Sequence, residues 1–151
     1  MDRLLKKHPK NPIVVADDFP GDAMYVLNPG VIKVGDEYIM LCDVATLAQP
    51  MYIHIARSRD GVNFKFDEEL IDWPQPDPTH PEDCVYDPRI TEIDGTYYIY
   101  YASSSEGFGV RVGIIKTRDF KKFDRVAMGS ELGNRNAILF PKKINGLYCR
   151  L

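Results

Sequence analysis

Three short motifs stand out because their side chains could bind a sugar or an anion. They are Asn28-Pro29-Gly30, Asp87-Pro88-Arg89 and Arg135-Asn136, and each comes at or just before an apolar run. Amides and carboxylates hydrogen-bond to sugar hydroxyls, and the guanidinium group of arginine binds phosphate or carboxylate in a forked geometry. If the motifs meet, one pocket would contain amides, an acid and bases.

Asp87 is the strongest candidate for acid chemistry. A carboxyl group in a pocket acts as a general acid if burial raises its pKa, and binds a sugar hydroxyl if burial does not. The alternative is structural, with Asp87 capping a turn and pairing with Arg89. From these residues alone both interpretations stay open.

A repeat of 59 residues indicates why the motifs should meet. The stretch NPGVIKVGDEYIMLC, from Asn28, is similar to DPRITEIDGTYYIYYA, from Asp87. Further along, ARSRDGVNF (56–64) is similar to IKTRDFKKF (115–123) at the same offset. Several matches at one offset favour a duplicated structural unit over chance.

Each unit reads as four short antiparallel strands, with a tight glycine turn after the first strand. Such units at this length predict an all-β fold made of β-propeller blades, and a single β-sandwich with two similar hairpins is the alternative. We predict one partial propeller domain over residues 1–151, with repeats at about 24–80 and 83–130 and an incomplete third at 134–151. Loops that enter the innermost strands face the propeller axis, which would gather the three motifs there.

Closed propellers have about 4 to 8 blades, so two and a half blades leave open strand edges. These edges predict either a fragment of a longer protein or self-association that closes the ring.

Composition excludes several other classes. The 151-residue chain has a net charge of −3, which argues against nucleic-acid binding. Its start lacks the apolar core of a signal peptide, and no stretch approaches the roughly 18 apolar residues that cross a bilayer. The three cysteines and three histidines lack metal-ligand or disulfide spacing. We therefore expect a cytoplasmic protein without a metal, a cofactor or a membrane partner. The acids of the proline-rich loop 74–83 are interpreted as solvated; they are Asp77, Glu82 and Asp83.

Together, the motifs resemble glycoside hydrolase family 130, the β-mannoside phosphorylase and β-mannosidase family. The resemblance rests on NPGVIKVGDEYIMLC, YDPRITEIDGTYYIYYA, VRVGIIKTRDFKKF and NAILFPKKINGLYCRL, in this order from about residue 8 to the last. It implies a five-bladed propeller, of which this chain would be the N-terminal part. It also implies an inverting cleavage of β-mannosides, with inorganic phosphate as co-substrate in phosphorylases and water in hydrolases.

The resemblance assigns roles to four residues. Asp87 matches the proposed general acid, whose proton is thought to pass through a sugar hydroxyl. Asn28 would bind substrate in the −1 subsite, and Arg111 and Arg135 would contact phosphate. Arg89, beside Asp87 in its own motif, is a further candidate for substrate binding.

Two positions depart from the family pattern. Cys42-Asp43 stands where the family commonly has a Tyr-Arg pair, so a sugar contact is lost or moved, and Tyr86 stands where it often has Glu. Two other functions stay open: a non-catalytic propeller piece with a carbohydrate-binding or structural role, and another five-bladed glycosidase of the arabinanase type.

Overall fold

The computed structural model describes residues 4–48, 50–74, 79–129 and 133–151, and it confirms the all-β class. Two four-stranded antiparallel sheets follow the chain order, and the described residues contain no α-helix, only a short 3-10 helix, η1 (Ala16–Asp18). The first sheet consists of β1 (Ala23–Val34), β2 (Glu37–Thr46), β3 (Tyr52–Ser58) and β4 (Lys65–Phe66). The second consists of β5 (Cys84–Ile93), β6 (Thr96–Ser105), β7 (Gly109–Thr117) and β8 (Asp124–Met128).

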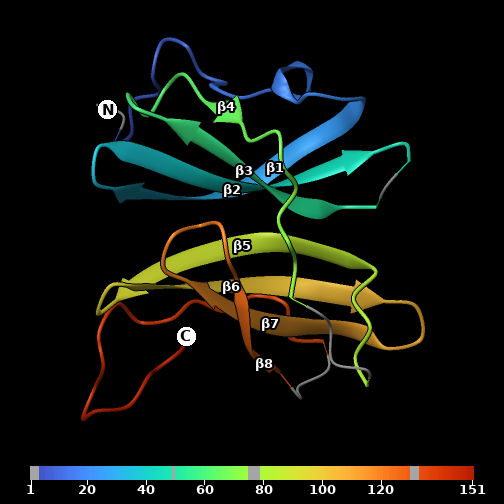
Figure 1. The fold of residues 1–151 in the computed structure, drawn as a ribbon, viewed down its shortest axis with the longest axis vertical. Coiled ribbons are helices and arrows are strands. Elements are labelled where there is room, and N and C mark those ends of the chain that lie inside the picture. The colour runs from blue at the N-terminus through green and yellow to red at the C-terminus, as the bar shows by residue number, and fades with distance from the viewer. Residues whose placement is uncertain (1–3, 49, 75–78, 130–132) are drawn as a thin grey trace.

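The two sheets lie face to face, as successive propeller blades do (Figure 1). β1 and β5 contact each other, and β4 and β8 form the opposite edges. β2 is buried on both faces: Ile39 and Leu41 belong to the core cluster shared with the second sheet, whereas Met40 and Cys42 pack under the N-terminal segment. Side chains alternate between the faces of a strand, so Asp43 is on the same face as Ile39 and Leu41.

The 59-residue repeat reappears in the turns after β3 and β7. The Asp60 carboxylate accepts the N–H groups of the second and third residues after it, at 2.9 and 2.8 Å. The Asp119 carboxylate does the same at 2.9 and 3.0 Å. Gly61 and Phe120, at equivalent places, both have positive φ, 73° and 55°. Two turns of the same construction indicate that both blades are built alike.

The third unit is a hairpin that packs on the second blade. Isolated bridges pair Leu139 with Arg150 and Ile144 with Leu147 across an Asn-Gly turn. The Thr91 hydroxyl of β5 donates a hydrogen bond of 3.0 Å to the Leu139 carbonyl, which fixes the hairpin against β5.

A buried polar cluster fastens the segment that connects the two blades. The Glu82 carboxylate accepts the Tyr101 hydroxyl at 2.7 Å and pairs with Arg125, which also donates to the Pro74 carbonyl at 2.9 Å. The Glu82 side chain is only 2% exposed, so its prediction as a solvated acid was wrong. Asp83 is exposed and accepts the Ser105 hydroxyl, and Asp77 lies outside the described residues.

Position 113 on β7 has room only for glycine, because the Tyr101 ring of this cluster lies directly against it. A Cβ atom added to Gly113 would lie 2.1 Å from the Tyr101 ring, which cannot move because Glu82 and Arg125 hold its hydroxyl. We expect Gly113→Ala to lower the free energy of unfolding by at least about 2 kcal/mol, as overpacking does in a close-packed core. Urea unfolding measures this, with Gly21→Ala as a control, because a Cβ atom on Gly21 would come no closer than 3.4 Å to another residue and no left-handed backbone is involved. A loss in Gly113→Ala no larger than the control's would contradict the role of the contact.

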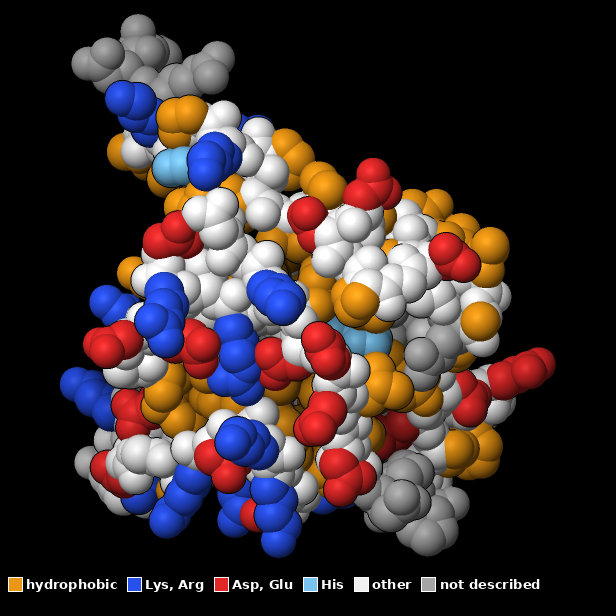
Figure 2. All heavy atoms as spheres, turned by 45° about the horizontal axis from the view of Figure 1, so that its top comes forward, with side chains coloured by type: hydrophobic (Ala, Val, Ile, Leu, Met, Phe, Trp, Pro, Cys, Tyr) orange, Lys and Arg blue, Asp and Glu red, His pale blue; other side chains and the backbone are white. Residues whose placement is uncertain are grey.

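The surface has charges of both signs. Figure 2 shows Lys and Arg side chains interspersed with Asp and Glu on one face of the molecule. Within the described residues no helix has the length and apolar character to cross a membrane. Nor do three His, Cys, Asp or Glu side chains gather there in a group that could hold a metal ion.

Candidate active site

The first and second blades interrupt their innermost strands at equivalent positions. Pairing with the neighbouring strand slips between Leu27 and Gly30 in β1 and between Tyr86 and Arg89 in β5. Asn28 and Asp87 lie in these bulges with φ of 45° and 57°. Left-handed backbone costs about 1 kcal/mol or more for a residue with a Cβ, though less for Asn and Asp than for most others. Its repetition at Asn28 and Asp87, which the sequence placed just before the strands and which lie inside β1 and β5, marks the bulge in each inner strand as a specialised position.

A close approach of the two inner strands supports these bulges. A Cβ atom on Gly30 would lie 2.7 Å from the carbonyl oxygen of Pro88 in the next blade. Gly30 therefore lets β1 and β5 come together beside Asp87.

Asp87 is buried, and ionisable groups from two other parts of the chain lie beside it. Its side chain is 7% exposed, and its carboxylate lies 3.8 Å from the Arg135 guanidinium, which precedes the third hairpin. Its own N–H donates a hydrogen bond of 2.9 Å to Oδ1 of Asp43, on β2. The structure thus brings Asp87 and Arg135 together, as the motifs predicted, and adds Asp43.

Tyr86 has a contact that the sequence did not indicate. The Arg135 guanidinium lies over the Tyr86 ring, 5.9 Å from the ring centroid. A cation over an aromatic face is attracted by the ring's negative quadrupole. Tyr86, one of the two departures from the family pattern, therefore helps to hold Arg135 beside Asp87.

The other predicted residues lie at different distances from Asp87. Asn28 is exposed at the equivalent position of the first blade, and Arg89 donates a hydrogen bond of 3.0 Å to the Pro88 carbonyl. Arg111 is on β7, two strands outward from β5, which places its backbone roughly 10 Å from that of β5. It donates to the Gly129 carbonyl at 3.4 Å.

Asp43 is the site residue that sequence reasoning missed. It is fully buried, and one of its carboxylate oxygens, Oδ2, has no partner within hydrogen-bond distance and geometry among the described residues, although the Asn28 side chain lies close enough to interact with the carboxyl group. Burial raises the pKa of Asp43 to about 7, and the Asp87 carboxyl group adds to the rise. The Asp87 N–H, the Asn28 side chain and the Arg89 charge oppose that rise. The sequence feature that could have pointed to Asp43 is that it is a lone acid within the apolar run YIMLCDVA (38–45).

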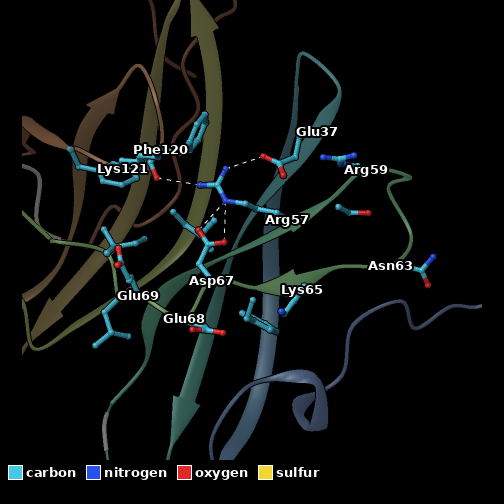
Figure 3. Close-up of a pocket in the computed structure, with 16 residues that line it drawn as sticks. Glu37, Arg57, Arg59, Asn63, Lys65, Asp67, Glu68, Glu69, Phe120 and Lys121 are labelled. Carbon is cyan, nitrogen blue, oxygen red and sulfur yellow. Dashed lines mark hydrogen bonds and ion pairs between the residues drawn. The ribbon is translucent and has the colours of Figure 1, made fainter.

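A large pocket lies at the other end of the strands, not at Asp87. It has a volume of about 740 Å³, and Figure 3 shows the Arg57 guanidinium within it. Arg57 is bound by Glu37 at 3.0 Å, by Asp67 at 2.9 Å and by the Phe120 carbonyl of the second blade at 3.4 Å. Glu37 and Asp43 are six positions apart on β2, which corresponds to about 20 Å. Arg57 is therefore a link between blades, remote from the candidate site.

Comparisons with known proteins agree with this arrangement. A family model described as beta-1,4-mannooligosaccharide phosphorylase matches residues 4–151. Beta-1,2-mannobiose phosphorylase from Listeria innocua is 35% identical over 100 residues, 66% of this chain and 27% of that protein. Beta-1,4-mannooligosaccharide phosphorylase from Ruminococcus albus is 27% identical over 149 residues, 94% of this chain and 44% of that protein. The chain thus spans less than half the length of these two relatives.

A solved structure shows the same fold. Beta-1,2-mannobiose phosphorylase from Listeria innocua, in complex with beta-1,2-mannobiose, superposes with a TM-score of 0.79 at 22% identity. The match covers 93% of this chain and 56% of that chain, so the two sheets correspond to about half of a five-bladed propeller. With a family match over nearly its whole length and blades of the same construction, the chain belongs to glycoside hydrolase family 130.

Proposed function

We propose that this chain carries the acid side of an inverting β-mannoside phosphorylase site, with Asp87 as the general acid. The observation that carries the proposal is the buried Asp87 carboxyl group, in the DPR motif of the family, beside the Arg135 guanidinium. The relatives named above are phosphorylases of mannobiose or mannooligosaccharides, which supports a β-mannoside substrate.

The proposed reaction exchanges one bond at the anomeric carbon for another. A phosphate oxygen attacks that carbon from the face opposite the glycosidic oxygen, and the bond to the leaving sugar breaks. The Asp87 proton passes through a sugar hydroxyl to the glycosidic oxygen, which leaves Asp87 as a carboxylate. The products are mannose 1-phosphate with inverted configuration and a sugar shortened by one residue.

The basic and amide side chains have distinct roles in this proposal. Arg135 and Arg111 hold the phosphate dianion, because guanidinium groups bind phosphate through charge-assisted hydrogen bonds. Asn28 and Arg89 bind sugar hydroxyls.

We further propose that copies of this chain associate through their open edges. Exposed apolar side chains support this: Leu27 and Val31 on β1 are 41% and 47% exposed, and Leu147 in the C-terminal hairpin is 68% exposed. Such surface is commonly covered in an assembly.

Product analysis tests both proposals. Purified protein is incubated with β-1,4- and β-1,2-linked mannobiose, with and without inorganic phosphate, over a range of protein concentrations. We expect mannose 1-phosphate to form only when phosphate is present. If copies of the chain associate, the specific activity should also rise with protein concentration. Release of free mannose without phosphate would replace phosphorolysis by hydrolysis. No turnover at any concentration would contradict the enzymatic proposal, and constant specific activity from a monomer would contradict association.

A further inference from the structure

The bulge in β5 takes Asp87 out of the regular pairing with β6. Tyr86 pairs with Ala102 and Arg89 with Tyr100, so Asp87 and Pro88 have no opposite residues on β6. A buried N–H that loses its ladder partner must find another acceptor. Oδ1 of Asp43 accepts it at 2.9 Å, across the boundary between the two blades.

Asp43 is held rigidly for this contact. On β2 it pairs with Leu27 of β1 and Ile53 of β3, so strands flank it on both sides. Its side chain is fully buried and cannot swing into solvent. The acceptor is therefore fixed relative to the first blade.

The second blade shows that this fold does not need an acid at this position. The residue 59 positions after Asp43 is Ala102, which is also fully buried. Burying a carboxyl group is costly unless its oxygens are satisfied, and within the part of the chain that the structure describes Oδ2 of Asp43 accepts no hydrogen bond. We therefore expect the Asp43 carboxyl group to lower the stability of the first blade. The second blade has alanine at the equivalent position, and the unit that follows it has Arg135-Asn136 where the second blade has the Asp87 motif.

We propose that Asp43 is the positioning residue of this site: its carboxyl group fixes the left-handed main chain of Asp87 and thereby sets the direction of the Asp87 carboxyl group. The effect of Asp43 on the reaction rate rests on the proposed function, whereas its effect on the main chain of Asp87 does not. Without the Asp43 acceptor, the peptide unit before Asp87 can rotate to find water. The Asp87 carboxyl group would then turn away from Arg135.

Three variants separate positioning from general stability. Asp43→Ala copies the second blade and removes the acceptor. Asp43→Asn keeps an acceptor oxygen without the charge. Val44→Ala is the matched control, because Val44 is a fully buried neighbour on the opposite face of β2 and its truncation lowers stability without touching Asp87.

Amide hydrogen exchange of Asp87, followed by NMR, tests the structural part without any turnover. Relative to Val44→Ala, we expect Asp43→Ala to speed exchange at Asp87 by about 10-fold or more, because a local hydrogen bond has been removed. Asp43→Asn should keep exchange close to that of the unchanged protein. Equal exchange at Asp87 in Asp43→Ala and Val44→Ala would overturn the proposal, whatever the activity.

Kinetics test the consequence. We expect Asp43→Ala to lower kcat by about 10²-fold with little change in KM, as small misplacement of a reacting group does, and Asp43→Asn to recover most of the loss. Faster exchange with unchanged kcat would reduce Asp43 to a structural role and overturn the proposal. If the unchanged protein does not turn over, the proposed function fails, while the exchange result still decides whether Asp43 positions Asp87.

Discussion

Asp87→Asn is expected to lower the rate of β-mannoside phosphorolysis by about 10² to 10⁴-fold, the usual contribution of a general acid. Asparagine has the shape of aspartate but has no acidic proton to give. Its N–H can still donate to Asp43, and asparagine already occupies the equivalent left-handed position at residue 28. The fold should therefore persist, and the loss should fall on kcat. Initial rates of mannose 1-phosphate release measure it.

A matched control separates the acid from its surroundings. Asp83→Asn makes the same chemical change four residues earlier, at an exposed acid that binds Ser105. We expect Asp83→Asn to keep its rate within about threefold, since exposed polar contacts contribute little. If Asp87→Asn were as active as Asp83→Asn, Asp87 would not be the general acid.

The blades could be predicted because their signals are local. The tight turns need positive φ at Asp94-Gly95 and Asn145-Gly146, and these dipeptides are the residues that favour it. The Asp60 and Asp119 turns close within three residues, so their sequences match wherever the blades match. Local chemistry of this kind can be read directly from a repeat.

The inter-blade contacts could not be predicted in the same way, because their partners are far apart along the chain. Asp43 meets Asp87 across 44 residues, and Glu82 meets Arg125 across 43. A solvated acid and a buried acid look the same in a loop sequence, so Glu82 was assigned to the surface. The DPR motif located Asp87, but only the packing of two blades shows which group receives its N–H.

Between about pH 5 and pH 8, Asp43→Asn is expected to gain roughly 3 kcal/mol of unfolding free energy relative to the unchanged protein. The pKa of Asp43 rises from 3.8 to about 7 in the folded state, chiefly through burial. Between these values the folded protein binds more protons than the unfolded chain, so its stability falls as the pH rises toward 7. Asparagine stays neutral, so the Asp43→Asn protein does not lose this stability as the pH rises. Urea unfolding of both proteins at several pH values measures the difference.

Asp119→Asn is the control for this trend. Hydrogen bonds from two backbone N–H groups lower the pKa of Asp119, so it is ionised in both folded and unfolded chains above about pH 5. The difference in unfolding free energy between Asp119→Asn and the unchanged protein should therefore stay constant from about pH 5 to pH 8. If the unfolding free energy of Asp43→Asn relative to the unchanged protein were also independent of pH, Asp43 would keep its charge in the folded protein. The Arg89 charge, the Asn28 side chain and the Asp87 N–H would then outweigh its burial, and Asp43 would accept the Asp87 N–H as a carboxylate at neutral pH.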